Sequence, residues 1–335
     1  MSSKGLVPPG LTYLADNIIS RQNILGAGKE QRARWAKGLN LPVSADTIFF
    51  AGCGYQYSDD LEALMSMIRR LDRSVIGAEF PLRFANLQKK LGVDLAGIYR
   101  KVLARRGSSQ AQPLLDAVKV LQGFNIEFGY LGEEEPCCGA PLYFSGMHEQ
   151  FADNARQAYR QLRERGIKRI ISIVPSCTYA LRSLFPLFVE GYDLEVKHFT
   201  EILSENISRR KLCFPQQVKI TYHDPCQLAR YLGLTEEPRQ ILKAIENVEL
   251  VETEWTKGEW ATCCGGGGGF EAVYPDLSEM LSANRARELA ETGADTVVTQ
   301  CPGCVMQLKD GLKAAKIKNV AVLDLAQVVA MAMEV

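Results

Sequence analysis

The sequence predicts an α/β protein built from two parallel sheets, each with flanking helices. Short apolar runs alternate with helix-period segments along the chain, and this alternation is typical of parallel strands joined by crossover helices. One cysteine pattern occurs twice, and at 335 residues the chain is long enough for two domains of ordinary size. We therefore expect an internal duplication with one sheet in each half.

The chain divides into three segments. Residues 1–43 contain Pro8-Pro9-Gly10 and an amphipathic stretch near 11–19, and we expect an N-terminal helix and linker there. The first domain is expected over residues 44–206 and the second over residues 207–335. The first domain carries a long insertion, because 83 residues separate Cys53 from Cys137 whereas 36 separate the corresponding cysteines of the second domain.

The predicted strands each end just before a cysteine. They cover residues 47–51, 170–174, 218–222 and 296–299. Helices are predicted over residues 59–70, 112–121, 151–165, 237–245 and 277–291. Open α/β sheets commonly bind their ligands at the carboxyl ends of the strands, so we expect the cysteines to form sites at these ends.

The second half carries a complete cysteine set. Cys226 is followed by the pair Cys263-Cys264 and then by Cys301 and Cys304, with 36 residues in each gap. Thiolates grouped in this way favour soft metals, in zinc sites or iron–sulfur clusters, over a disulfide framework. Five thiolates exceed the four that one tetrahedral zinc takes, which favours a multi-iron cluster. A closed zinc site and a group of buried cysteines are the alternatives.

The first half carries a shorter version of the same pattern. Cys53, Cys137, Cys138 and Cys177 align with Cys226, Cys263, Cys264 and Cys304. Val174 then takes the place of Cys301, and Gly166 precedes Val174 by eight residues just as Gly293 precedes Cys301. The first site therefore keeps four candidate ligands and has lost one.

The glycine run 265–269 follows the second cysteine pair. Without side chains, its backbone is expected to approach a cluster closely and to offer N–H donors to sulfur. A phosphate-binding loop is the competing interpretation, but the run lacks the Lys-Ser/Thr that such a loop requires.

Three histidines and one further cysteine are weaker candidates. His223 and Asp224 precede Cys226, where they could orient a cluster or deliver protons, although His223 could equally be structural. His148 and His198 stand near predicted helix starts and are expected to cap or pack there. Cys213 lies outside both repeats and is expected to be a small buried hydrophobe.

The composition limits the possible partners and the compartment. The chain has 39 basic and 39 acidic residues, so it offers no charge excess for nucleic acid or an anionic membrane. Ten cysteines without a secretory signal fit a reducing compartment. We expect the cytoplasm, or the cytoplasmic face of a membrane complex. No run of 18 apolar residues exists, so any membrane link is expected to come through a partner.

The arrangement Cys-x36-Cys-Cys-Gly-x35-Cys-x2-Cys resembles the cysteine-rich CCG domain, which occurs twice in the B-like catalytic subunits of heterodisulfide reductases. The resemblance covers about residues 46–331. It implies two pseudo-twofold-related domains with clusters at the strand ends. It also implies that the five cysteines of the second set hold a noncubane 4Fe-4S cluster. The first site has Val174 in place of a ligand. Three possibilities stay open for it: an ordinary iron–sulfur cluster, an altered one, or no cluster.

The resemblance also implies a function. The chain is expected to be an iron–sulfur subunit that reduces or forms a disulfide, with a small thiol or disulfide as substrate and His223 or solvent as proton donor. No Cys-x2-Cys-x2-Cys-x3-Cys run is present, so electrons are expected from a separate ferredoxin-like iron–sulfur or flavin subunit, with a membrane cytochrome as a further candidate partner.

Two other functions remain open at this point. One is a non-catalytic electron relay between a flavin dehydrogenase and a quinone pool or membrane cytochrome, for which a single active cluster is enough. The other is a zinc-stabilised scaffold protein, which predicts no iron.

Overall fold

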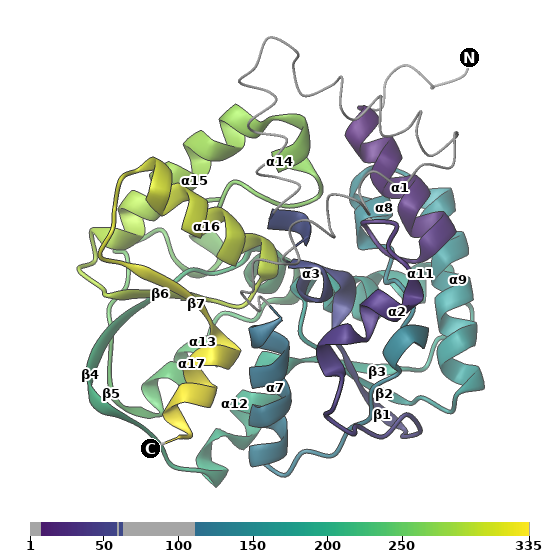
Figure 1. Ribbon diagram of the computed structural model, residues 1–335, viewed down its shortest axis with the longest axis horizontal. Coiled ribbons are helices and arrows are strands. Elements are labelled where there is room, and N and C mark those ends of the chain that lie inside the picture. The colour runs from purple at the N-terminus through teal and green to yellow at the C-terminus, as the bar shows by residue number, and fades with distance from the viewer. Residues whose placement is uncertain (1–7, 59, 63–110, 335) are drawn as a thin grey trace.

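The computed structural model describes residues 8–58, 60–62 and 111–334 and contains two parallel sheets (Figure 1). The first sheet has the order β1-β2-β3, with bounds Thr47–Phe50, Arg169–Ser172 and Glu195–His198. The second has the order β5-β4-β6-β7, with bounds Ile245–Leu250, Leu212–Tyr222, Thr296–Thr299 and Ala321–Asp324. Every pairing is parallel, which confirms the predicted fold class.

Helices flank both sheets. Those of the first half are α1 (Pro9–Arg21), α2 (Lys29–Arg32), α3 (Gly52–Gln56), α7 (Gln112–Gly123), α8 (Ala140–Phe144), α9 (His148–Glu164), α10 (Pro175–Tyr179), α11 (Phe185–Phe188) and α12 (Phe199–Asn206). Those of the second half are α13 (Glu237–Lys243), α14 (Phe270–Val273), α15 (Pro275–Ala290), α16 (Pro302–Ala314) and α17 (Leu325–Ala332). Two π-helical turns, η3 (Ala180–Leu184) and η5 (Gln227–Tyr231), lie close after Cys177 and Cys226.

The two halves repeat one topology. Strands β1, β2 and β3 correspond in order to β4, β6 and β7. The first strand of each half has a parallel neighbour on its outer edge, which is β5 beside β4 and a single bridge from Ile48 to Gly129 beside β1. The last strands, β3 and β7, both end in a capping box, where His198 and Asp324 accept hydrogen bonds from the first turn of the next helix.

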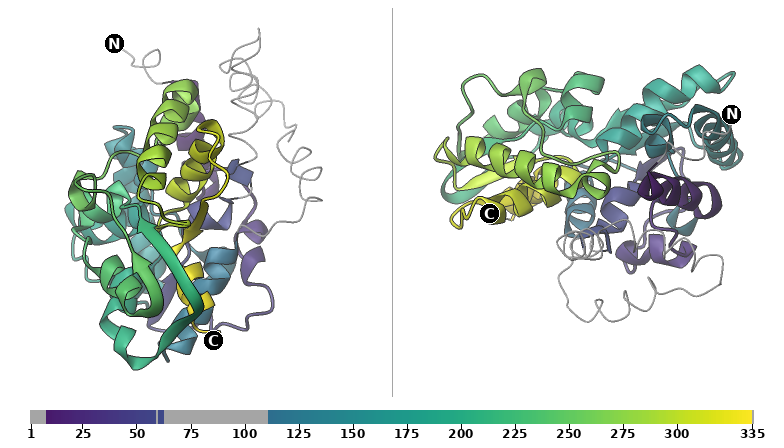
Figure 2. Two further views of the ribbon diagram at one scale, coloured as in Figure 1. Left: turned by 90° about the vertical axis from the view of Figure 1, so that its left-hand side faces the viewer. Right: turned by 90° about the horizontal axis from the view of Figure 1, so that it is seen from above.

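The halves also contact each other reciprocally. Helix α7 of the first half packs on α17 of the second, and α12 of the first half packs on α13 of the second. Likewise α3 meets α16, and α10 meets η5. Because each pair of contacts exchanges corresponding elements, the halves are related by a pseudo-twofold axis. Figure 2, in the view from above, shows them side by side.

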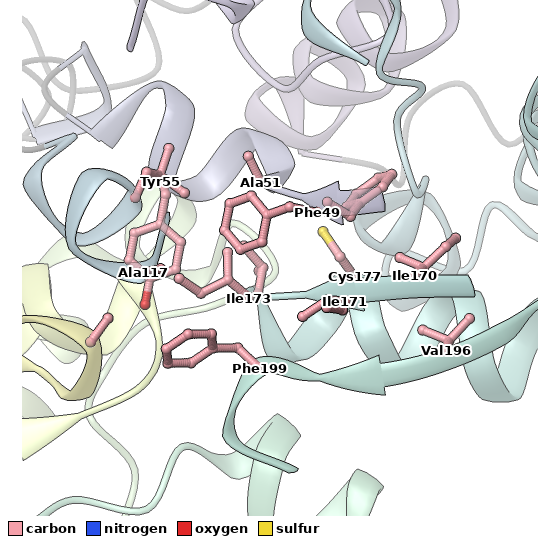
Figure 3. Close-up of a cluster of buried hydrophobic side chains, with 14 of the residues drawn as sticks. Phe49, Ala51, Tyr55, Ala117, Ile170, Ile171, Ile173, Cys177, Val196 and Phe199 are labelled. Atoms are coloured by element: carbon pink, nitrogen blue, oxygen red, sulfur yellow. The ribbon is translucent and has the colours of Figure 1, made fainter. Parts of the chain in front are cut away.

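The larger of the two apolar clusters among the described residues runs through both halves. In the first sheet, Phe49, Ile171 and Val196 from the three neighbouring strands are buried together with Cys177 (Figure 3). The same cluster of buried side chains extends to Tyr222 and Leu325 of the second half. A second, smaller cluster of buried side chains, which includes Cys264, Cys304 and Leu308, lies within the second half.

The sequence identified some elements better than others. The four predicted strands lie at β1, β2, β4 and β6, and the helices predicted over 112–121, 151–165 and 277–291 lie at α7, α9 and α15. Strands β3, β5 and β7 were missed, and residue 245, the predicted end of a helix, begins β5. The helix expected over 59–70 lies largely outside the described residues. Within the described part of the chain, no helix combines the length and the apolar character needed to cross a membrane.

Candidate metal centres

The cysteines of the complete set come together at the carboxyl end of the second sheet. Cys226 follows β4, Cys301 caps α16, and Cys304 lies in the first turn of that helix. The loop before α14 brings in the cysteine pair, so that the sulfur of Cys264 lies 3.2 Å from that of Cys304. Burial and the nearby Cys301 and Cys264 raise the pKa of Cys226 to about 11.

This crowding fits a metal cluster. Several thiolates in a low-dielectric site repel one another, so they ionise together only where a cation compensates their charge. All five cysteines of the set offer sulfur, which suits iron–sulfur chemistry. Contacts with Cys263, Cys304 and His223 lower the pKa of the Cys264 thiol. The residues present therefore fit an iron–sulfur cluster at this site.

The glycine after each cysteine pair has a definite structural role. Gly139 and Gly265 adopt φ angles of 70° and 89°, which favour glycine, and their N–H groups donate to the sulfurs of Cys137 (3.5 Å) and Cys263 (3.3 Å). A Cβ at Gly265 would lie 2.4 Å from the Ser278 carbonyl oxygen of α15. The third residue of the Cys-Cys-Gly motif must therefore be glycine.

Replacing Gly265 by alanine is expected to lower the free energy of unfolding. The positive φ alone costs roughly 1–3 kcal/mol, and the clash with α15 adds to it. Gly267 is the matched control, because its φ is 116° but a Cβ there meets no atom within 4 Å. Denaturant unfolding should show a larger loss for Gly265→Ala than for Gly267→Ala, and equal losses would contradict the steric explanation.

Two other glycines of the run lie close to neighbouring helices. A Cβ at Gly266 would meet the Gln307 side chain, and one at Gly269 would meet Leu11 of α1. These glycines permit close packing against α16 and α1. Only the Gly265 N–H is hydrogen-bonded to a cysteine sulfur.

His223 and Asp224 lie at the end of β4 and have different surroundings. His223 is buried, and its ring lies close to the sulfurs of Cys264 and Cys304, with the three ligand atoms within 4.8 Å of one another. Asp224 instead forms a buried bidentate ion pair with Arg239, at 2.8 and 2.9 Å, and accepts from the backbone of Gly258. Asp224 therefore connects α13 and the backbone at Gly258 to the end of β4.

The four cysteines of the first set also come together. The sulfurs of Cys138 and Cys177 are 3.1 Å apart, which repeats the pairing of Cys264 with Cys304. Cys53 hydrogen-bonds to Cys137, and this contact and burial raise the pKa of the Cys53 thiol well above its usual range. In this group Cys137, Cys138 and Cys177 are buried and Cys53 is half-buried.

Val174 lies where the first set lacks a ligand. It is the N-cap of α10, just as Cys301 is the N-cap of α16. Val174 is buried, and a Cβ at Gly52 would come within 2.8 Å of its Cγ2 and 3.0 Å of the Cys177 sulfur. A hydrocarbon side chain therefore occupies this position, and it lies on the same side of Gly52 as the Cys177 sulfur.

Two charged residues beside the first site were not among the predicted site residues. Glu135 is buried and accepts from the backbone N–H groups of Ala51 (2.8 Å) and Gly52 (3.0 Å), and desolvation raises its pKa to about 7. Arg32, from the segment predicted as a linker, donates to the Glu135 carbonyl. No repeat signal marked either residue, because Ala261 stands in the position that corresponds to Glu135.

The remaining candidates belong to neither cysteine set. His198 caps α12, donates from Nε2 to the Ile173 carbonyl at 3.1 Å, and has its pKa lowered by burial to about 3. His148 begins α9 and packs edge-on against Tyr143. Cys213 is half-buried on β4 rather than fully buried.

The two sites face each other across the pseudo-twofold axis. A Cβ at Gly54, next to Cys53, would lie 2.7 Å from Pro302, next to Cys301. The Tyr55 hydroxyl, which Figure 3 shows at the edge of the first core, hydrogen-bonds to Asp324. Gln300 donates to Asp324 at 3.0 Å. Buried polar contacts thus join the residues flanking the two cysteine sets.

The free energy of unfolding is expected to depend on pH through Asp324, which takes part in these contacts. Desolvation raises the pKa of its carboxyl from 3.8 to about 7. The folded protein therefore binds a proton that the unfolded chain releases, and stability falls as pH rises from about 4 to about 7, by at most about 1.4 kcal/mol per pH unit. Asp324→Asn keeps the cap but does not ionise, so unfolding midpoints against pH should lose this fall. Parallel wild-type and variant profiles would contradict the assignment.

The cysteine-rich domain family CCG matches residues 103–182 and 220–309, which together make just over half of the chain. This chain belongs to the CCG family. Both matched regions carry cysteines of the two sets described above. The CCG repeat is thus the same duplication that the reciprocal contacts show.

Several curated proteins are similar. The chain is 35% identical over 221 residues to one subunit of the dihydromethanophenazine:CoB--CoM heterodisulfide reductase of Methanosarcina barkeri, covering 64% of this chain and 54% of the relative. It is 36% identical over 227 residues to "EtfAB:quinone oxidoreductase" of Syntrophomonas wolfei, covering 65% and 31%. It is 31% identical over 205 residues to an "Uncharacterized iron-sulfur protein" of Methanocaldococcus jannaschii, covering 61% and 39%. The CCG chain spans about half the length of the first of these relatives.

A solved structure shares the fold. A hypothetical protein from Helicobacter pylori superposes with a TM-score of 0.50 at 14% identity, covering 66% of this chain and 45% of the other. That likeness concerns the fold alone. Family membership, the relatives and the sulfur donor set together support an iron–sulfur subunit of oxidoreductase type.

Proposed function

We propose that this CCG protein is the iron–sulfur subunit of a heterodisulfide-reductase-like complex, in which it reduces or forms a disulfide. Its second cysteine set would hold a noncubane 4Fe-4S cluster through Cys226, Cys263, Cys264, Cys301 and Cys304. Such a cluster exchanges single electrons and offers iron to a substrate sulfur. A ferredoxin-like or flavin-containing partner would supply the electrons, at the cytoplasmic face of a membrane complex or in the cytoplasm.

The observation that carries this proposal is the open side of the second site. Cys263 is exposed, and Cys226 and Cys301 are half-buried, whereas Cys264 and Cys304 are buried. Beyond the cysteine pair, a Cβ at Gly267 or Gly268 meets no atom within 4 Å. A small thiol or disulfide can therefore approach from the Cys263 side. In the first site, by contrast, the only cysteine that is not fully buried is Cys53.

Individual residues of the second site would have different roles in this reaction. Cys264 and Cys304 anchor the buried side of the site, and the Gly265 N–H stabilises negative charge on the Cys263 sulfur. His223 is buried behind Cys264, so solvent at the exposed Cys263 side is better placed to protonate a leaving thiolate.

The test is the response of the bound cluster to substrate. Anaerobically purified chain is titrated with small thiols and disulfides, including the coenzyme M–coenzyme B heterodisulfide, and followed by low-temperature EPR. We expect a new EPR signal when wild-type protein is mixed with one class of thiol or disulfide. A spectrum that no thiol or disulfide changes would contradict it.

A second candidate, electron relay, is favoured by Val174. Because Val174 stands at the N-cap position that Cys301 holds in the second half, the two sites are not equivalent. A mechanism in which two clusters each bind one sulfur of a disulfide would then lack an equivalent second cluster. An electron relay needs one active cluster. Rapid electron transfer from a flavin partner to a quinone, without any spectral response to thiols, would favour the relay.

A further inference from the structure

Arg285 is a charged side chain in an unusual position. It lies in the middle of α15, its side chain is 0% exposed, and it is among the largest fully buried side chains of the described residues. Burying a guanidinium is costly unless its donors are used, and two of the three nitrogens of Arg285 are hydrogen-bonded, whereas Nη2 has no partner among the described residues. Its Nη1 donates to Glu288 at 2.7 Å and to Thr256 at 3.1 Å. Its Nε donates to Nδ1 of His223 at 3.1 Å.

The bond to His223 determines where that ring carries its proton. A guanidinium only donates, and it does not lose its proton in proteins. Nδ1 of His223 must therefore present a lone pair, and the proton of the neutral ring must be on Nε2. One ring nitrogen also lies within 4.8 Å of the Cys264 and Cys304 sulfurs.

We propose that Arg285 is a positioning residue that fixes the His223 tautomer, so that the Nε2–H donates a hydrogen bond to the Cys264 thiolate. A donor to a cluster thiolate stabilises the reduced, more negative state and raises the reduction potential. The same tautomer prevents His223 from ligating iron, because a ligating Nε2 needs its lone pair and the ring then donates from Nδ1.

The duplication provides an independent observation. In the overlay that aligns Cys53 with Cys226, Phe50 takes the place of His223. In the overlay that aligns Gly166 with Gly293, Ala158 takes the place of Arg285. Phe50 and Ala158 are both buried. The first half, which lacks the fifth cysteine, therefore also lacks both members of the His–Arg pair, so the pair is associated with the complete cysteine set.

The inference rests on a cluster at the second site but not on the disulfide activity. The tautomer is measured first, by 15N NMR of the full chain labelled at its three histidines. We expect one histidine with its proton on Nε2 whose resonances change in Arg285→Met. A His223 protonated on Nδ1 would overturn the proposal whether or not the chain acts on disulfides.

The second measurement is an EPR-monitored redox titration of the iron-loaded chain. Arg285→Met and His223→Phe should each lower the reduction potential at unchanged iron content, and the double variant should lower it no further. Arg285→Gln, whose amide can still donate to Nδ1, should retain most of the wild-type potential. Arg287→Met is the control, because Arg287 is on the same helix and its side chain donates to Asn284 in an exposed contact.

Two outcomes would overturn the proposal. One is an unchanged potential in both His223→Phe and Arg285→Met. The other is strong 15N hyperfine coupling from a histidine in wild type, which would mean that His223 ligates iron directly. If Arg285→Met fails to fold, His223→Phe removes the same hydrogen bond from its other end and decides the question.

Discussion

Cys264→Ser is expected to remove the cluster of the second half, with a loss of about four irons per chain. Cys264 is buried, its sulfur lies 3.2 Å from that of Cys304, and it contacts His223. Serine offers a harder oxygen ligand with a much higher pKa, so it replaces a soft thiolate poorly. Iron and acid-labile sulfide, measured on anaerobically purified protein, provide the readout.

The matched control for this variant is Cys213→Ser. Cys213 is a half-buried cysteine on β4, away from both cysteine sets, and its sulfur lies 3.2 Å from the Phe214 carbonyl oxygen. We expect full iron content in this control. Retention of all iron in Cys264→Ser would mean that the second set does not bind the cluster.

Val174→Cys is expected to give the first half a fifth thiol and a cluster like that of the second half. Val174 is the N-cap of α10, the position that Cys301 holds on α16, and it packs beside Gly52 and the Cys177 sulfur. Cysteine is smaller than valine, so the substitution introduces no overlap. Made in the Cys264→Ser background, where only the first set remains, it should raise the iron bound per chain.

Val174→Ala separates the new thiol from the loss of the methyl groups. Alanine opens the same space without a ligand, so it should leave the iron content of the Cys264→Ser background unchanged. If valine, alanine and cysteine at position 174 all bind the same amount of iron, the missing ligand does not limit the first site.

The cysteine sites were predictable because of how parallel sheets are built. A ligand that follows directly after a short apolar strand must lie at the carboxyl end of the sheet, so Cys53, Cys226 and Cys301 could be placed from local sequence alone. Alignment of the two halves also predicted that Val174 stands in the position of Cys301. Spacing and strand position together were enough to indicate which residues meet.

The surroundings of the sites were not predictable in the same way. Arg32 and Arg285 reach their partners through tertiary packing, and arginines on amphipathic helices usually face solvent. Strand β3 reads Glu195-Val-Lys-His198, and its charged residues conceal a strand only four residues long. The reciprocal contacts of α7 with α17 involve residues more than 200 positions apart, which no local pattern specifies.

The central claim is that the second cysteine set holds an iron–sulfur cluster independently of the first. Iron, zinc and acid-labile sulfide contents, with low-temperature EPR, should be compared between wild type and Cys138→Ala. Cys138→Ala removes a buried ligand of the first set only. We expect the variant to keep about four irons and sulfides per chain and the EPR signal of the second site. Zinc in place of iron in wild type, or loss of all iron in Cys138→Ala, would contradict the claim.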